Sequence, residues 1–387
     1  MMVSLIEIVL LSILAICFIT QMIFYWAVLA KPYYYMRSVK KGNVRFFSDC
    51  PPVSVIVYVR NRFYDLRDFL PALLEQDYPQ FEVIIVNDGS TEENKNTLFR
   101  LQEQYANLYF THIPDETKNV NRKKLGLTLG IKAAKYDCLL FTRADSHTRS
   151  SNWIKLMVRH FGKDKNVVLG MSAKEKEDGF FSKFIIFDYF YSNLQMLSMA
   201  LLNRPHSGSG RNLIYSKTHY NESARYHSIR HIEDGLFIND MADESNVKVE
   251  LSPESVIMTD LNAYDWRQEK KNKAFANHFY KIGSVARWNL EYFSRFFFIL
   301  SVIACAYWGV MYLDTLTYMA GAAVGCYLIR FFSQLFVLNK IASSLELENF
   351  YLKIPLFDIM QILVNVYFFM FRVVHKKENY IFKYEKR

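Results

Sequence analysis

Residues 53–86 read "VSVIVYVRNRFYDLRDFLPALLEQDYPQFEVIIV", and this stretch decides the fold. Residues 53–59 form an apolar, valine-rich run that is typical of a buried strand, and residues 81–86 form a second such run. Between them, residues 63–76 place apolar side chains at helical spacing. A strand, a helix and another strand in this order predict two parallel strands joined by a crossover helix.

The alternation of strand and helix patterns continues beyond this stretch. Strand-like runs at 107–113 and 136–142 flank a helical pattern at 122–135. We therefore predict an α/β fold, Rossmann-like, with a mixed but mainly parallel sheet and helices on both faces. Ligands bind such sheets beyond the carboxyl ends of the strands. Asp88 and Asp145 both follow strand-like runs, so we expect them to line one crevice.

The composition indicates a soluble domain joined to membrane segments, because 51% of the 387 residues are hydrophobic and 16% are aromatic. The formal net charge of +9 favours anionic partners such as phosphate groups or anionic lipid. No nucleic-acid-binding motif accompanies this charge, so nucleic acid is not an expected partner. The five cysteines form no close pair, which argues against a disulfide framework and suits a reducing compartment.

The N-terminal segment, residues 1–30, predicts a transmembrane anchor. Its apolar stretch is interrupted only by Glu7 and Gln21, and it lacks the basic start and small-residue cleavage site of a signal peptide. Residues 31–46 form a basic juxtamembrane segment with five Lys or Arg and no acid. Positive flanks favour the cytoplasmic side, so we expect the domain that follows, residues 47–290, to be cytoplasmic.

A transmembrane hairpin is predicted over residues 296–338, with its turn around Asp314. Arg330 lies inside the second arm, where it must reach the interface or face protein. The hairpin and the N-terminal anchor together predict a multi-pass protein of the inner, or cytoplasmic, membrane.

Residues 354–374 form another apolar stretch, followed by a basic tail over residues 375–387. Asp358, Gln361 and Asn365 share one helix face at spacings of three and four. Either this face packs on protein and the segment spans the membrane, or the helix is re-entrant or interfacial. The sequence leaves both interpretations open.

Several motifs carry a family signal in chain order. They are "VSVIVYVRN", "LLEQDYPQFEVIIVNDGSTEE", "KKLGLTLGIKAAKYDCLLFTRADSHTRSSNWI", "GSGRNLIYSK", "HIEDGLFIND" and "WRQEKKNK". In this order, and over roughly residues 50–280, the chain resembles the membrane-bound inverting glycosyltransferases of family 2. The resemblance implies a GT-A type fold, a nucleoside-diphosphate sugar as donor, and Mn²⁺ or Mg²⁺ as cofactor.

The resemblance also assigns roles to residues of this chain. Asp88 matches the aspartate that contacts the nucleoside, and Lys123 matches a lysine near the nucleotide. Asp145 matches the second acid of the D-x-D element, the usual metal ligand. Glu233 and Asp234 match the acidic pair whose second member is the catalytic base. Two further donor-side residues match the Gln and Arg of Q-x-x-R-W, namely Gln268 and Lys271.

This chemistry explains why such residue types are needed. The leaving diphosphate gains negative charge, which a hard cation or a basic side chain stabilises. The acceptor hydroxyl needs a base to take its proton, the role expected for Asp234. For Asp88 and for Glu233-Asp234, a plain turn or helix start is the competing interpretation.

Two departures from the family pattern concern charge. Arg143 stands where the first acid of the D-x-D element is expected, and Arg62 stands where many relatives carry an acid. An arginine repels a cation but binds phosphate directly. We therefore expect a working site with a weakened or altered metal requirement. His147 is a second candidate metal ligand beside Asp145. The alternative is that His147 is a solvated loop residue.

Two segments are expected on the acceptor side. Residues 204–215 place Gly208, Gly210 and Asn212 in a loop. Either its glycines permit close approach of the backbone to a ligand, or it is a simple connecting loop. Residues 179–203 predict either an interfacial helix at the membrane surface or a core helix.

The sequence therefore predicts a membrane-anchored inverting glycosyltransferase whose acceptor is a lipid, a lipid-linked glycan or a polysaccharide. The alternative is a catalytically altered, nucleotide-sugar-binding membrane subunit, which the arginines at 62 and 143 favour. Neither the donor sugar nor a protein partner is named by any motif.

Overall fold

The computed structural model describes residues 4–374 except 61–62, 90–91, 115–120, 163–166, 223–233, 242–246, 278 and 313–315. The side chains of 63–68, 92–94, 222, 234, 241 and 316–317 also lie outside the described part. The chain forms two compact units, residues 1–35 with 281–367 and residues 36–280 with 368–387. The first unit is helical, and the second is an α/β unit.

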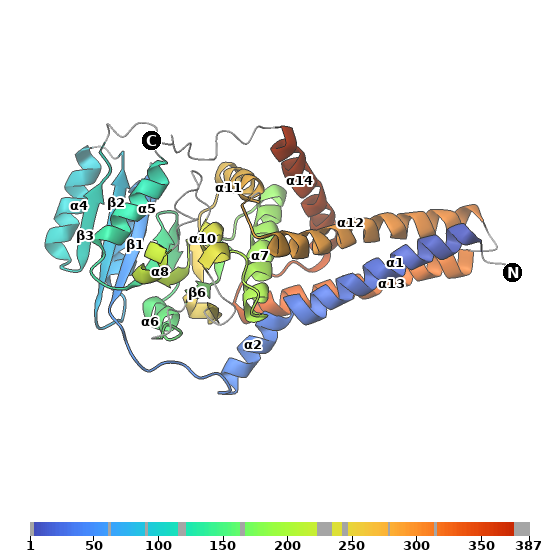
Figure 1. The fold of residues 1–387 in the computed structure, drawn as a ribbon, viewed down its shortest axis with the longest axis horizontal. Coiled ribbons are helices and arrows are strands. Elements are labelled where there is room, and N and C mark those ends of the chain that lie inside the picture. The colour runs from blue at the N-terminus through green and yellow to red at the C-terminus, as the bar shows by residue number, and fades with distance from the viewer. Residues whose placement is uncertain are drawn as a thin grey trace. The chain divides into compact units, whose positions relative to one another are not determined.

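The α/β unit is built on a mixed sheet whose strands lie in the order β3-β2-β1-β4-β8-β6-β9 (Figure 1). Neighbours β3-β2, β2-β1, β1-β4 and β6-β9 are parallel, and β8 runs antiparallel to both of its neighbours. The predicted mainly parallel sheet is therefore confirmed. The strands are β1 Val53–Arg60, β2 Phe81–Asp88, β3 Leu108–His112, β4 Cys138–Arg143, β6 Val167–Gly170, β8 Leu213–Ser216 and β9 Val247–Glu250.

Helices cover both faces of this sheet, as predicted. One face of β1, which includes Val55 and Val57, packs in a core with side chains of α3 (Phe63–Leu74), α4 (Glu92–Gln104) and α6 (Trp153–Val158). The opposite face packs on α5 (Arg122–Ala133). A Cβ at Gly130 of α5 would lie 2.8 Å from Ile56 Cγ2, so glycine is needed for this close approach.

A second, three-stranded sheet has the order β5-β10-β7, formed by Ser146–Thr148, Ile257–Thr259 and Ser172–Lys174. Helix α7, Phe180–Leu201, packs against β7 and β9 and is buried on all sides over most of its length. An all-round apolar helix of this kind belongs to a protein core. This burial favours the core-helix interpretation of residues 179–203. The remaining elements of the unit are α8 Lys217–Glu222, α10 Asp234–Met241, the 3₁₀ helix η2 Pro253–Ser255 and α11 Ala263–Ala276.

The helical unit contains α1 (Leu5–Ile23), which continues as the π-helix η1 (Phe24–Leu29), and the long helices α12 (Ile282–Met311) and α13 (Leu316–Ser344). Helices α1, α12 and α13 run side by side (Figure 1). A 3₁₀ turn, Tyr351–Lys353, precedes α14 (Ile354–Val374), and α2 (Lys31–Lys40) follows η1. In the described part of the chain, four helical segments are long and apolar enough to cross a membrane: Leu5–Lys40, Ile282–Met311, Tyr318–Ser344 and Tyr351–Val374.

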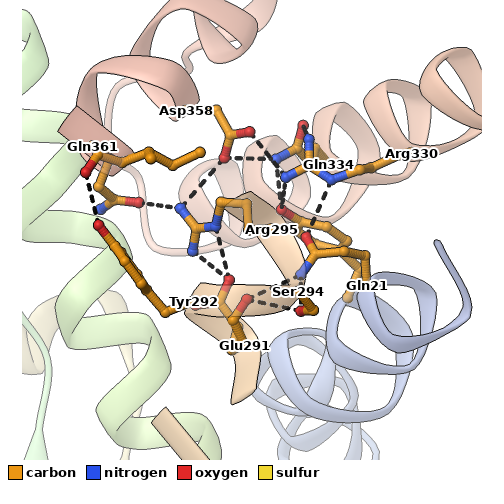
Figure 2. Close-up of polar contacts among 11 residues, drawn as sticks. Gln21, Glu291, Tyr292, Ser294, Arg295, Arg330, Gln334, Asp358 and Gln361 are labelled. Carbon is orange, nitrogen blue, oxygen red and sulfur yellow. Dashed lines mark hydrogen bonds and ion pairs between the residues drawn. The ribbon is translucent and has the colours of Figure 1, made fainter. Parts of the chain in front are cut away.

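A group of four charged side chains is buried where these helices meet, and we call it the helical cluster (Figure 2). Its members are Glu291 and Arg295 of α12, Arg330 of α13 and Asp358 of α14. Arg295 Nε donates to Glu291 Oε1 at 2.9 Å, and Arg330 Nη2 donates to Asp358 Oδ2 at 2.9 Å. Each of the four side chains is only 2–3% exposed.

Amide side chains complete the helical cluster. Gln21 Oε1 accepts from Arg330 Nε at 3.1 Å, and Gln361 Oε1 accepts from Arg295 Nη1 at 2.5 Å. Arg330 therefore faces protein, and the face of α14 that carries Asp358 and Gln361 packs on protein too. Both interpretations of residues 354–374, a spanning helix and a re-entrant or interfacial one, stay open.

Candidate functional site

Three neighbouring strands end together at one edge of the large sheet. In the register of β1 with β2, Arg60 lies opposite Asp88, and in that of β1 with β4, Tyr58 lies opposite Arg143. A cavity of about 230 Å³ opens at this edge, as expected for the carboxyl ends of parallel strands. It is lined by Tyr58, Arg60, Lys123, Leu127, Phe141, Thr142, Arg143, Ala144, Asp145, Gly210, Leu213, Tyr215, Phe237 and Asp265.

Asp88 is buried beside this cavity, with 1% of its surface exposed. Its carboxylate accepts hydrogen bonds from the Tyr58 hydroxyl and from Arg122 Nε, the latter at 2.6 Å, and Arg60 Nε lies 3.6 Å away. Burial, and then the hydrogen bond to Asp88, raise the pKa of Tyr58, so its hydroxyl remains a donor. Lys123 lines the cavity itself.

The other acidic residue that was expected at this edge, Asp145, belongs to a second group of four charges, which we call the cavity cluster. Its members are Arg143, Asp145, Arg211 and Glu269. Arg211 Nη2 donates to Asp145 Oδ2 at 2.7 Å and lies 2.8 Å from Glu269 Oε1. Arg143 Nη1 donates to the same Glu269 oxygen at 2.6 Å. One carboxylate oxygen therefore joins the two guanidinium groups.

The cavity cluster has a buried side and an open side. The side chains of Arg211 and Asp145 are 2% and 3% exposed, whereas those of Arg143 and Glu269 are 33% and 30% exposed. Burial acts to lower the pKa of Arg211, but the carboxylates of Asp145 and Glu269 more than reverse this and raise it. Burial acts to raise the pKa of Glu269, and the two guanidinium groups hold it below its ordinary value. Arg211 and Glu269 are therefore both charged at neutral pH.

The surroundings of Asp145 do not match those of a resident Mn²⁺ or Mg²⁺ ion. One oxygen accepts from Arg211, and the other accepts from the Ser146 hydroxyl at 3.1 Å and has Arg143 Nε at 3.6 Å. Hard cations take several oxygen ligands, and a guanidinium group repels them. Among the residues that the structure describes, no three His, Cys, Asp or Glu side chains gather as a cation site. The residues present do not fit such a cation.

His147, the second candidate metal ligand, is engaged elsewhere. Its Nε2 lies 2.7 Å from Glu175 Oε1, and its ring stacks on Phe69 with centroids 4.6 Å apart.

Helix α11 brings Glu269 to the cavity cluster, although the sequence predicted its neighbours Gln268 and Lys271. Lys271 Nζ lies 5.0 Å from the centroid of the Phe371 ring. In the described part of the chain, neither Gln268 nor Lys271 lines the cavity. Their role in donor binding stays a prediction.

The orientation of α11 is fixed by a buried carboxylate of α7. Asp188 is 1% exposed and accepts from Trp266 Nε1 at 2.8 Å and from Lys270 Nζ at 2.7 Å. These two contacts hold the turns on either side of Glu269. No sequence motif had assigned this role to Asp188.

The loop expected on the acceptor side divides into two parts. Gly210 lines the cavity. Asn212 does not face it: its side chain is 1% exposed, accepts from Trp153 Nε1 at 3.1 Å and donates to Met171 O and Ser255 O, both at 2.8 Å. Asn212 therefore holds the core together. Gly208 packs on the aliphatic side chain of Ile238 in α10, which leaves little room for a Cβ.

The expected catalytic pair lies at the edge of the described residues. Glu233 lies outside them, and of Asp234 only the backbone is described, as the first residue of α10. Phe237, one turn further along α10, lines the cavity.

Comparison with known proteins agrees with this fold. Residues 54–223 match the family model described as glycosyl transferase family 2. A poly-beta-1,6-N-acetyl-D-glucosamine synthase of Staphylococcus epidermidis is 27% identical over 134 residues, 34% of this chain and 30% of the relative. A putative glycosyltransferase EpsH of Bacillus subtilis is 28% identical over 134 residues, 34% of this chain and 36% of the relative. The chain thus spans about a third of the length of these curated relatives.

A solved structure shares the fold over nearly the whole chain. It is a mannosyltransferase, PcManGT from Pyrobaculum calidifontis, in complex with GDP-Man and Mn²⁺. The TM-score is 0.51 at 14% identity, with 92% of this chain and 99% of that chain covered. The sheet, the cavity at its carboxyl edge and the matched residues lead to one conclusion: residues 54–223 form a glycosyl transferase family 2 domain.

Proposed function

We propose that this protein is a membrane-anchored, inverting glycosyltransferase that moves a sugar from a nucleoside-diphosphate donor to a polysaccharide, lipid-linked glycan or lipid acceptor. The observation that carries the proposal is the cavity at the carboxyl edge of a family 2 domain, which three cationic side chains line: Arg60, Lys123 and Arg143. Their positive charge suits a diphosphate, and the buried Asp88 beside them suits the donor's nucleoside.

The reaction we propose is a single displacement. The acceptor oxygen bonds to the anomeric carbon while its proton passes to Asp234. The bond from that carbon to the diphosphate oxygen breaks, and its electron pair leaves with the nucleoside diphosphate. One displacement inverts the anomeric configuration. Basic side chains at the cavity stabilise the charge that develops on the leaving group.

The acceptor and the location rest on further observations. Curated relatives named as poly-beta-1,6-N-acetyl-D-glucosamine synthases support a polysaccharide acceptor for this chain. Four long apolar helical segments support a membrane anchor, and the basic residues 31–46 support an α/β unit on the cytoplasmic face of the inner membrane. We propose a multi-pass arrangement in which the growing acceptor is handled at the membrane.

The test uses the full-length protein in lipid nanodiscs with a panel of radiolabelled UDP- and GDP-sugars. We expect release of the nucleoside diphosphate and transfer of label from at least one donor to an extracted membrane acceptor. Asp234→Asn is expected to slow transfer by about 10²–10⁴-fold while leaving nucleotide affinity within about twofold, because only the proton transfer is lost. Asp240→Asn, on the same helix, is the matched control.

The possible outcomes separate the alternatives. Unchanged transfer by Asp234→Asn would remove that residue from the base role. Binding of donors without turnover of any of them would favour the alternative function, a nucleotide-sugar-binding subunit, which the arginine at position 143 also suggests. If no nucleotide or nucleotide sugar binds, the proposed function is wrong.

A further inference from the structure

The cavity cluster places a guanidinium group where a glycosyltransferase of this type is expected to hold a cation. Both carboxylates of the cluster are already matched by arginines: Arg211 Nη2 lies 2.7 Å from Asp145 Oδ2, and Arg143 Nη1 lies 2.6 Å from Glu269 Oε1. Two positive and two negative charges leave no net negative charge to attract a divalent ion. A cation bound at Asp145 would also lie close to two guanidinium groups, which repel it.

Of the two arginines, only Arg143 is positioned to meet a ligand. Arg211 is 2% exposed, its guanidinium carbon lies 5.6 Å from the centroid of the Tyr189 ring, and its Nη1 lies 3.4 Å from the Tyr189 hydroxyl. Arg143 lines the cavity, and a third of its side chain is exposed. Arg211 thus holds the carboxylates in place, while Arg143 carries its positive charge to the cavity surface.

From these contacts we infer that Arg143, which lines the cavity, binds the donor's diphosphate directly, in place of a divalent cation at Asp145. This inference rests on the proposed function. The planar guanidinium group donates two parallel hydrogen bonds to phosphate oxygens and stays charged at every accessible pH. It therefore supplies the charge stabilisation that the leaving diphosphate needs. Glu269 holds Arg143 at the cavity, and the Arg143 guanidinium then donates hydrogen bonds both to Glu269 and to the diphosphate.

The test is calorimetric titration of the full-length protein in nanodiscs with UDP and with GDP, once in EDTA and once in Mn²⁺. For the wild-type protein we expect the Kd of the nucleotide that binds to differ by less than about threefold between the two conditions. Arg143→Lys keeps the positive charge but loses the planar group that donates two parallel hydrogen bonds. We expect it to weaken nucleotide binding in EDTA by about tenfold, which corresponds to 1.4 kcal/mol. Arg149→Ala removes an exposed arginine of the same segment and is expected to bind as the wild type does.

Arg143→Asp is the decisive variant, because it creates the acidic pair that this chain lacks. With Asp145 and Glu269 nearby, the added carboxylate reverses the charge balance of the cavity cluster in favour of a cation. We expect nucleotide binding by this variant to be lost in EDTA and restored in Mn²⁺. Loss of the free Mn²⁺ signal in electron paramagnetic resonance gives a readout that does not depend on turnover, and circular dichroism checks the fold.

The outcomes distinguish this inference from the proposed function. Wild-type binding that needs Mn²⁺ would overturn the direct role of Arg143 and leave the proposed function standing. Equal affinity of the wild type and Arg143→Lys in EDTA would also overturn it. Binding of neither nucleotide in either condition would overturn both proposals.

Discussion

The helical cluster and the cavity cluster contain the same charges, two arginines and two carboxylates, in two different settings. In the helical cluster all four side chains are 2–3% exposed, and amide groups such as Gln21 and Gln361 take up further hydrogen bonds. In the cavity cluster, Arg143 and Glu269 are about a third exposed beside a cavity of about 230 Å³. The two clusters therefore have the same composition, and they differ in whether their side chains are exposed to a cavity.

The difference teaches which buried charges are available for binding. When buried charges have all their partners within one group, that group fixes how the helices pack. Removing any one of its side chains leaves an unpaired charge in the protein interior. A group that is open on one side exchanges an internal partner for a ligand at little cost. We expect changes in the helical cluster to alter stability, and changes in the cavity cluster to alter nucleotide binding.

The largest effect is expected from Arg330→Ala in the helical cluster. The change leaves the Asp358 carboxylate, which is 3% exposed, without its partner at 2.9 Å. Breaking one partner of a buried pair costs about 3–5 kcal/mol, so we expect a clear fall in the denaturation midpoint of the nanodisc-embedded protein. Nucleotide affinity of the protein that remains folded is expected to stay unchanged.

Lys340→Ala, exposed on the same helix, is the matched control and is expected to alter stability by no more than about 0.5 kcal/mol. If Arg330→Ala is as stable as this control, the helical cluster does not fix the packing of its helices. A selective loss of nucleotide binding would contradict the division of roles.

An intermediate effect is expected at a third group of charges, which lies in the α/β unit. Glu250 is 1% exposed, accepts from Arg159 Nε at 2.8 Å and lies 2.8 Å from His160 Nε2. Burial acts to raise the pKa of Glu250, but His160 and Arg159 lower it from 4.5 to about 2. This difference corresponds to about 3 kcal/mol of stability.

Because the pKa of Glu250 is lower in the folded state, its contribution is fully present above about pH 4.5 and is lost as the pH falls towards 2. Glu250→Gln resembles the protonated form, so we expect it to be about 3 kcal/mol less stable at pH 7. Denaturant titrations at pH 7, 5, 4 and 3 should show the gap to the wild type closing below pH 4.5. A gap that stays constant over this range would exclude the ionised carboxylate as its cause.

The smallest effect is expected from Glu269→Gln in the cavity cluster. The amide still accepts a hydrogen bond from Arg143 but no longer repels the diphosphate, so we expect about threefold tighter nucleotide binding in EDTA, or roughly 0.7 kcal/mol. Glu175→Gln changes a carboxylate that contacts His147 and lies outside the cavity cluster, and it serves as the control. Weaker binding by Glu269→Gln would mean that its charge supports Arg143 and does not compete with the diphosphate.

The sheet and the apolar helices were predictable from the sequence because their signals are local. Valine-rich runs announced β1 and β2, and the apolar stretch 354–374 coincides with α14. The sequence did not predict the start of α12 at Ile282, because its first turns are more polar than the apolar span predicted from residue 296.

The cavity cluster was only half predictable. Arg143 and Asp145 follow a strand in the sequence, so their place at the sheet edge was expected. Their partners are distant: Arg211 lies 66 residues from Asp145, and Glu269 lies 126 residues from Arg143. Which side chain of α11 joins the cavity cluster depends on the Asp188 contacts, and these arise only when α7 is packed. No local pattern contains that information.

We propose that the exposed arginine of the cavity cluster, and not a cation, binds the donor's diphosphate. The most direct measurement is a structure of the full-length protein with bound nucleoside diphosphate, prepared in EDTA. We predict phosphate oxygens within hydrogen-bond distance of the Arg143 guanidinium, with the helical cluster unchanged. A diphosphate that does not contact Arg143 would contradict direct binding by this arginine.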